Sequence, residues 1–373
     1  MRYFLLLLLL FSGLPAYSQA LPRCVDRPAS VLLPRVRPGF CLELIAREQN
    51  AGEWAFYGLA VDDAGTLYAT RPQYGQLLAI HDTNGDDLPD TPVVVAEGLD
   101  LPIALHHHEG SLYIAGGGSV YRWRDGALTT LYDGLPTGTG IVNGGVTVWR
   151  DRLIVGVGAA CDRCPPDPAR GLLLSMALDG SDARALAEGF RQPSLLAVYD
   201  DTLWASDTAP ESSEEAFGDE LNRVVEGAHY GYPACPPQAA CEAPVYRFAT
   251  HNSLAHLLPY NGAAFPDFAG QALLVMSGSA ASINPVGFQV AMLEGLGRPD
   301  AFFRTIVPYD TSITAATDRA YQPEGYYDVS VMILTRRGAS FYPHRPLSAA
   351  VGPQGWIYVA VSDGYLYALR PVA

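Results

Sequence analysis

The chain contains no lysine, since all 24 of its basic residues are arginines, and it carries 39 acidic residues and a formal net charge of −15. Without a lysine amine, Schiff-base chemistry, a pyridoxal-phosphate enzyme and a Walker-type P-loop are excluded. The acidic balance argues against nonspecific nucleic-acid binding, which requires a basic surface. Arginine still binds anions well because its planar guanidinium matches a carboxylate. We therefore expect a protein that holds anions but has few side chains for base chemistry.

The sequence also lacks a run of 18 consecutive apolar residues, so we expect no membrane span. Residues 1–20 have the features of a secretory signal: Arg2, an apolar run over 5–11, and the small-residue cleavage pattern Ser18-Gln19-Ala20. We predict a mature protein of residues 21–373 that is periplasmic or secreted. A retained N-terminal anchor is the alternative.

Six cysteines fall into three pairs that are close in sequence, and export favours disulfides. The simplest pairing is 24–41, 161–164 and 235–241. A redox motif at 161–164, or a zinc site that joins 161/164 to 235/241, is the alternative.

A weak repeat runs through the chain, in which an apolar strand, a turn and a second apolar strand recur. The second strands of the first four units begin at Leu67, Leu112, Leu153 and Leu203, so the steps are 45, 41 and 50 residues. Two later units place first strands at 262–264 and 347–350. A period of 40 to 50 residues with four short strands per unit is typical of a β-propeller. We predict an all-β, six-bladed β-propeller in one domain, with two stacked sandwiches as the alternative.

The last unit ends one strand short. The segment 40–45 precedes the first unit and has strand character, so we expect this N-terminal strand to close the last blade and remove its open edge. Residues 219–225 could form a short helix, but their place inside a blade predicts a strand.

The stretch 189–233 contains the most informative motifs. Residues 189–193 read Gly-Phe-Arg-Gln-Pro, 218–222 read Gly-Asp-Glu-Leu-Asn, and 230–233 read Tyr-Gly-Tyr-Pro. This pattern resembles the soluble quinoprotein sugar dehydrogenases, in particular the glucose/sorbosone dehydrogenase family. The resemblance implies a six-bladed propeller that oxidises a sugar, polyol or sugar aldehyde by hydride transfer to pyrroloquinoline quinone (PQQ) and passes the electrons to an external acceptor.

The resemblance also implies a cofactor site. The cofactor's carboxylates call for guanidinium groups and a divalent cation. By position in the motifs, the cofactor-binding residues are Arg191, Gln192, Thr208 and Arg345, and the backbone carbonyls of Ala209 and Pro210 would reach calcium.

The family's catalytic residues are not all present. The position that we align with its base histidine is Ile141, which accepts no proton, and the cofactor-contacting lysine of glucose-oxidising members is absent. The catalytic residues are therefore unassigned, with His251, His256 and His344 as replacement candidates. A noncatalytic propeller that binds a ligand or a protein is the main alternative function, and a metal-dependent lactonase is another.

Two further motifs contain metal-ligand residue types. Asp82, Asn84, Asp86 and Asp90 place oxygen ligands at alternate positions, as calcium loops do, although the pattern is not an EF-hand. The tract 106–108 is three consecutive histidines, of which only two could converge if it were a strand. We expect a calcium site or a plain turn for the first motif, and a solvated loop for the second.

Overall fold

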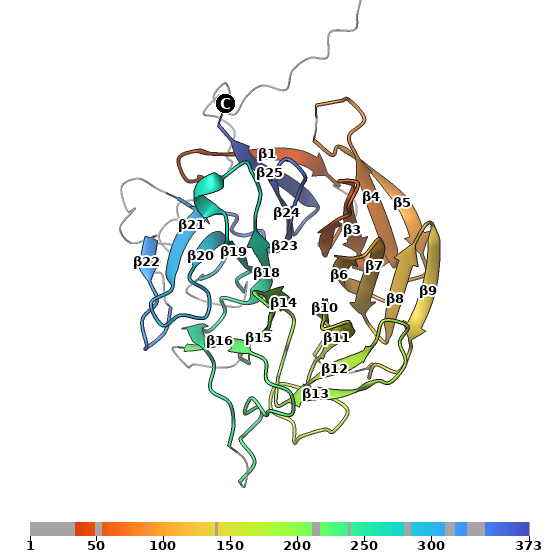
Figure 1. Ribbon diagram of the computed structural model, residues 1–373, viewed down its shortest axis with the longest axis vertical. Coiled ribbons are helices and arrows are strands. Elements are labelled where there is room, and N and C mark those ends of the chain that lie inside the picture. The colour runs from red at the N-terminus through yellow and green to blue at the C-terminus, as the bar shows by residue number, and fades with distance from the viewer. Residues whose placement is uncertain are drawn as a thin grey trace, which may run out of the picture.

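The computed structural model describes residues 34–48, 54–86, 88–138, 141–210, 217–237, 240–279, 285–309, 318–326 and 340–372. Six β-sheets stand around one axis as the blades of a propeller (Figure 1). This confirms the predicted fold class. The predicted signal at 1–20 lies outside the described residues, and within them no helix has the length and apolar character needed to cross a membrane.

The first three blades each have four antiparallel strands. Blade 1 consists of β2 (Leu59–Val61), β3 (Leu67–Arg71), β4 (Gln76–His81) and β5 (Thr91–Glu97). Blade 2 consists of β6 (Pro102–His108), β7 (Ser111–Gly116), β8 (Ser119–Arg124) and β9 (Ala127–Tyr132). Blade 3 consists of β10 (Val146–Trp149), β11 (Arg152–Val157), β12 (Leu172–Ala177) and β13 (Arg184–Glu188).

The other blades are less regular. Blade 4 consists of β14 (Leu196–Tyr199), β15 (Thr202–Asp207), β16 (Phe217–Arg223) and β17 (Tyr246–Ala249). Blade 5 has five strands: β18 (Leu254–Tyr260), β19 (Gln271–Met276), β20 (Gln289–Glu294), β21 (Phe302–Val307) and β22 (Asp318–Ala320). Blade 6 consists of β23 (Pro346–Val351), β24 (Ile357–Val361), β25 (Tyr365–Pro371) and β1 (Phe40–Arg47). Two short 3₁₀ helices are η2 (Pro72–Tyr74) and η3 (Pro266–Phe268).

The N-terminal strand closes the ring as predicted. β1 pairs antiparallel with β25, with Leu42 opposite Leu369, and forms the outer edge of blade 6 (Figure 1). Closure therefore joins the two ends of the chain within one sheet, which stabilises the ring through strand pairing.

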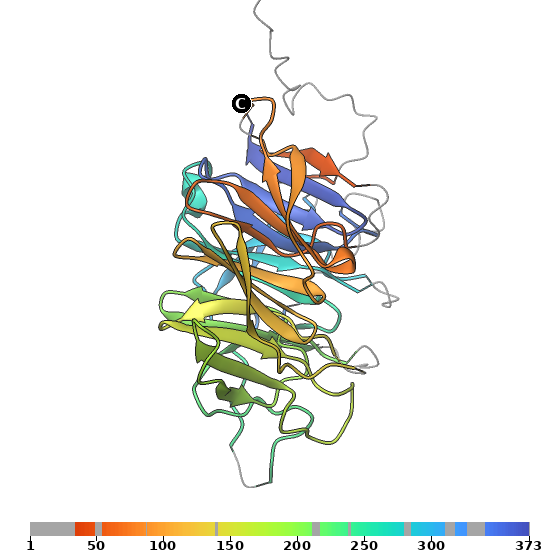
Figure 2. The ribbon, with the colours of Figure 1, turned by 90° about the vertical axis from the view of Figure 1, so that its right-hand side faces the viewer.

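The apolar core lies between the blades rather than within one layer. Six buried clusters each join two neighbouring blades; the cluster that contains Leu59 and Leu78 of blade 1, for example, also contains Ala360 and Leu366 of blade 6. Both faces of each sheet are thus covered, which explains why second strands such as β7 and β19 are buried along their whole length. The side view shows the blades stacked against one another (Figure 2).

The innermost strands β2, β6, β10, β14, β18 and β23 contact one another in a ring around the axis. The sequence prediction was wrong for one of them, because the first strand of blade 5 is β18 and not the segment 262–264. β18 pairs on one side only, with β19, and a proline such as Pro259 is tolerated in an edge strand of this kind. The segment 262–264 is a turn in which Gly262 approaches Gly355 so closely that a Cβ would lie 2.5 Å from the Gly355 Cα.

The strand prediction for 219–225 is confirmed by β16, and two predicted disulfides are present. Cys161 bonds Cys164, and Cys235 bonds Cys241, so neither pair is available to zinc. Cys41 is also disulfide-bonded, and its predicted partner Cys24 lies outside the described residues.

Candidate functional site

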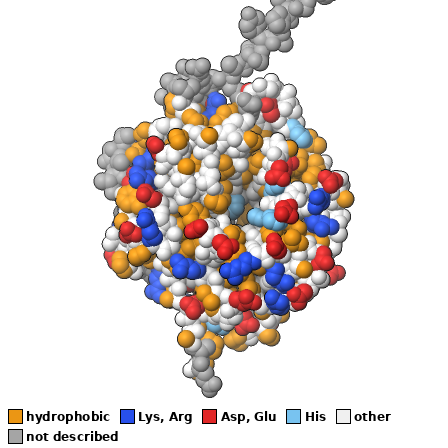
Figure 3. Space-filling view, viewed as in Figure 1, with side chains coloured by type: hydrophobic (Ala, Val, Ile, Leu, Met, Phe, Trp, Pro, Cys, Tyr) orange, Lys and Arg blue, Asp and Glu red, His pale blue; other side chains and the backbone are white. Residues whose placement is uncertain are grey.

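A cavity of about 250 Å³ opens on the propeller axis. It is lined by residues at the start of the inner strands of all six blades, from Gly58 in blade 1 to Ser348 in blade 6. The space-filling view shows the central hollow, with histidine side chains visible in it (Figure 3). We call it the axial cavity. Because each blade contributes to its wall, only closure of the ring assembles it.

The axial cavity brings together residues predicted from separate motifs. Arg191 and Gln192, in the loop between β13 and β14, and Thr208 and Ala209, which follow β15, share its lining with Arg345, which precedes β23 of blade 6. Pro210 lines a second cavity, of about 620 Å³, that shares Arg191, Thr208 and Ala209 with the first. We call it the lateral pocket.

Two buried carboxylates hold the backbone of the cavity wall in place through hydrogen bonds. Asp207 accepts hydrogen bonds from the backbone N–H groups of Arg191 (2.9 Å) and Gln192 (2.7 Å). Asp219 accepts from Ala209 (2.9 Å) and Ser253 (2.7 Å). Burial raises the pKa of Asp207 to about 7 and the pKa of Asp219 to about 6. The charge of Asp219 further raises the pKa of Asp207, whereas hydrogen bonds from backbone N–H groups lower both pKa values. Sequence motifs contained both residues, but only the fold shows that they position the cavity loops.

Most donors of the Arg191 guanidinium are occupied. Its side chain is 5% exposed, and its Nε–H donates to Asp162 Oδ1 at 2.9 Å. Nη2 donates to the same oxygen, and Nη1 donates to Gln192 Oε1 (3.2 Å) and to the Thr208 carbonyl (2.9 Å). Asp162 was not predicted from the sequence, because its contact with Arg191 joins residues 29 apart that only the fold brings together.

Arg345 has the opposite character. Its backbone N–H donates to Ser362 Oγ at 3.0 Å, but its buried Nε has no hydrogen-bond partner among the residues that the structure describes. A buried donor without a partner is costly, so an anionic group in the axial cavity would relieve this cost. The two arginines therefore differ: Arg345 offers an unused donor, and Arg191 has most of its donors committed.

Ile141, at the position aligned with the family's base histidine, is not among the residues that line the axial cavity. Val142, rather than the neighbouring Ile141, lines the axial cavity, and Ile141 donates its N–H to the Ala159 carbonyl. Neither side chain accepts a proton.

Of the three replacement histidines, His251 and His256 line the axial cavity. His256 Nδ1 accepts the Ala349 N–H at 2.9 Å, which places the ring proton on Nε2, and burial lowers the pKa of His256 to about 4. His256 is thus a neutral donor. His344 lies outside the lining and contacts Asp363 Oδ2 through Nδ1 at 2.6 Å.

His251 has a strained backbone, with φ of 76°, in the left-handed region that non-glycine residues rarely adopt. Its backbone N–H also donates to the Asp219 carboxylate, which helps to hold this conformation. Such strain persists where surrounding contacts over-determine the backbone, and it clusters at functional sites.

The histidine tract is not a solvated loop, and that expectation was wrong. Residues 106–108 end the inner strand β6, and the rings of His106 and His108 stack with centroids 6.4 Å apart. His107 points the other way, with Nε2 3.7 Å from Asp63 Oδ2, as strand alternation requires. Burial, with smaller contributions from neighbouring histidines, lowers the pKa of His106 to about 3.

The Asp82 loop is held by its own backbone. Asp82 Oδ1 accepts from the Gly85 N–H (2.7 Å), Asn84 Oδ1 accepts from Asp86 (3.0 Å), and Asp90 Oδ1 accepts from the Thr83 hydroxyl (2.6 Å). Among the described residues, no group of three or more His, Cys, Asp or Glu side chains is arranged to hold a metal ion. Calcium binding at Asp82, Asn84, Asp86 and Asp90 stays a prediction.

The fold was compared with known proteins. No protein-family model matches the chain, and no curated protein matches it in sequence. Solved structures do match. A calcium structure of the Trichoderma reesei carbohydrate-active enzyme family AA12 is 14% identical and has a TM-score of 0.66, with 92% of this chain and 98% of that chain covered.

Two further structures are similar over nearly their whole length. The holo form of the pyranose dehydrogenase PQQ domain from Coprinopsis cinerea is 13% identical, with a TM-score of 0.64 and coverage of 92% of this chain and 98% of that chain. The PQQ-bound aldose sugar dehydrogenase from Streptomyces coelicolor is 16% identical, with a TM-score of 0.52 and coverage of 91% and 99%. The chain therefore has the six-bladed propeller fold of the PQQ-dependent sugar dehydrogenases, as its motifs indicated.

Proposed function

We propose that this protein is an exported quinoprotein-type oxidoreductase that oxidises a sugar, a polyol or a sugar aldehyde. The observation that carries the proposal is the meeting of Arg191, Gln192, Thr208, Ala209 and Arg345 at one axial cavity. These residues come from three separate segments of the chain, and no segment alone defines a site. The similarity to sugar dehydrogenases in fold agrees with the proposal.

The residues present fit PQQ, whose carboxylates require cationic donors. Arg345 would hold one carboxylate, because its buried Nε has no other partner among the described residues. Gln192 and Thr208 would supply polar contacts, and the backbone carbonyls of Ala209 and Pro210 would contribute to a calcium site. When bound, PQQ supplies an acceptor for the substrate's hydride.

The chain itself must then remove a proton from the substrate hydroxyl. We assign this role to His251, because it lines the axial cavity, whereas Nδ1 of His256 accepts the Ala349 N–H and His344 lies outside the lining. A neutral imidazole can accept a proton at its unprotonated ring nitrogen. Asp219 would keep His251 in place through the backbone bond described above.

A second function is a noncatalytic propeller that binds a ligand. Ile141 favours it, because the position aligned with the family's base histidine holds a side chain that accepts no proton. The first proposal includes export to the periplasm or outside the cell, and an external electron acceptor. The disulfides Cys161–Cys164 and Cys235–Cys241 agree with export.

Reconstitution tests both functions. The purified protein is incubated with PQQ and calcium, cofactor binding is measured by titration, and reduction of an artificial dye is followed with a panel of sugars, polyols and aldehydes. Binding with dye reduction supports the oxidoreductase. Binding without reduction of the dye by any substrate supports the noncatalytic propeller. Absence of PQQ binding contradicts the proposed function.

A further inference from the structure

An acidic residue sits between the two cysteines of a disulfide and contacts the cavity arginine. Asp162 lies between Cys161 and Cys164, and its Oδ1 accepts from both Nε and Nη2 of Arg191. The Asp162 side chain is 40% exposed, whereas that of Arg191 is 5% exposed. A surface loop thus brings a negatively charged carboxylate into contact with a buried, positively charged guanidinium.

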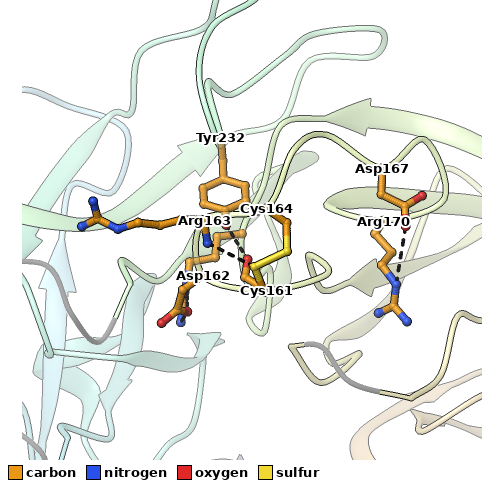
Figure 4. Close-up of a disulfide and its surroundings, with 8 residues drawn as sticks. Cys161, Asp162, Arg163, Cys164, Asp167, Arg170 and Tyr232 are labelled. Atoms are coloured by element: carbon orange, nitrogen blue, oxygen red, sulfur yellow. Dashed lines mark hydrogen bonds and ion pairs between the residues drawn. A yellow bond between two sulfur atoms is a disulfide. The ribbon is translucent and has the colours of Figure 1, made fainter.

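The loop is held in this position from two sides. The disulfide closes it, and the Tyr232 hydroxyl donates to the Cys161 carbonyl at 2.6 Å (Figure 4). Within the loop, the Arg163 N–H lies 3.4 Å from Cys161 Sγ. With both ends fixed, Asp162 loses little further conformational entropy when it bonds Arg191.

The contact limits what Arg191 can offer to a ligand. A guanidinium has five N–H groups. The hydrogen bonds to Asp162, Gln192 and the Thr208 carbonyl use four of them. A ligand carboxylate that approached Arg191 in the usual two-bond geometry would have to displace Asp162. Asp162 and Arg191 also both line the lateral pocket, so a displaced Asp162 has space to enter.

We propose that Asp162 is a positioning residue that acts as an internal anion: it competes with an anionic ligand for Arg191, and the Cys161–Cys164 disulfide holds it there. The identity of the ligand as PQQ rests on the proposed function. The competition itself rests only on the contacts of Asp162. Its consequence is that loosening the loop, or removing the charge of Asp162, tightens the binding of an anion in the axial cavity.

Two changes test this. Asp162→Asn removes the charge and keeps the shape. Reduction of the Cys161–Cys164 bond by a dithiol such as dithiothreitol gives two protein thiols and the oxidised reagent, with two electrons and two protons transferred to the protein, and it loosens the loop. The matched control is Asp167→Asn, since Asp167 is an acidic residue of the same segment whose partner is Arg170, at 3.8 Å (Figure 4). Cys235→Ser/Cys241→Ser removes a second disulfide, and thiol trapping with peptide mass spectrometry distinguishes reduction of Cys161–Cys164 from reduction at Cys41.

The first measurement is the Kd for PQQ in the presence of calcium. We expect D162N and reduction each to lower the Kd about threefold to tenfold, the range for loss of a partly exposed ion pair. Reduction of D162N should give no further gain, and D167N should bind like the wild type. Because the expected change is tighter binding, a variant that merely folds poorly does not imitate it. Unchanged or weaker binding in both D162N and the reduced protein would overturn the competition.

The second measurement needs no cofactor. The Asp162–Arg191 contact forms on the closed loop, so it stabilises the oxidised state. At equilibrium with dithiothreitol, trapping of the thiols and mass spectrometry should show the Cys161–Cys164 bond about threefold to tenfold more reduced in D162N than in the wild type, and unchanged in D167N. Equal reduction in wild type and D162N would refute the role of the disulfide. If no form of the protein binds PQQ, the proposed function is wrong. The extent of reduction in D162N and wild type then remains as the test of the link between Asp162 and the disulfide.

Discussion

Asp207 and Asp219 are two buried carboxylates that accept hydrogen bonds from three backbone segments of the axial cavity wall and hold them in place. The charge of Asp219 raises the pKa of Asp207. Each accepts backbone N–H groups, which favour the ionised form, but burial has the larger effect and favours the protonated form. Both groups therefore titrate in the folded protein well above the range of an unfolded aspartate.

This pair predicts a pH-dependent stability. Because the folded protein binds these protons more tightly than the unfolded chain, the pair's contribution to stability falls as the pH rises from about 4 to about 7. We expect Asp207→Asn to flatten this dependence, with a change on the order of a few kcal/mol across the window. Urea unfolding from pH 4.5 to 7.5 measures it, and Asp300→Asn, beside the exposed Arg298, serves as the control. An identical slope in D207N and wild type would contradict the raised pKa.

The unused donor of Arg345 predicts a loss of cofactor affinity on substitution. Arg345→Gln should weaken PQQ binding by about tenfold to a hundredfold, the range for loss of a charged hydrogen bond. Arg298→Gln, on a side chain that is 59% exposed and paired with Asp300, should leave the affinity unchanged. Calorimetric titration measures the affinity of both variants for PQQ. Equal affinities would show that Arg345 does not contribute to the cofactor site.

The proposed base predicts a separation of turnover from binding. His251→Gln should reduce dye reduction by about a hundredfold or more, because a general base contributes at least that factor, while PQQ binds as in the wild type. His344→Gln lies outside the cavity lining and should retain full turnover. Steady-state rates with a saturating substrate measure the effect. Full activity of H251Q would show that another group accepts the proton.

Ring closure by β1 predicts a contrast between two leucines of the same strand. Leu42 is 4% exposed and packs in the cluster between blades 5 and 6, whereas Leu44 is 40% exposed. Leu42→Ala should lower the free energy of unfolding by about 2–4 kcal/mol. Leu44→Ala should change it by less than about 0.5 kcal/mol. Urea denaturation compares them, and equal losses would mean that burial of β1 contributes little.

Strand periodicity was enough to predict the blades, because each blade repeats a local pattern of apolar residues and turns. It failed at β18, where His256 and Pro259 weaken the pattern of an inner strand that pairs on one side only. It also failed at β6, where three histidines looked like a loop although the strand continues to His108. In both places, packing around the axis overrides local composition.

The missing lysines, the repeat and the motifs of 189–233 could be read without a fold, because spacing along the chain is enough to define them. The chemistry of the site depended on which side chains meet across blades. Asp162 occupies Arg191, Arg345 keeps a buried donor unused, and Val142 rather than Ile141 faces the cavity. Each of these relations depends on how segments far apart in the chain pack around the axis, so no local pattern in the sequence encodes them.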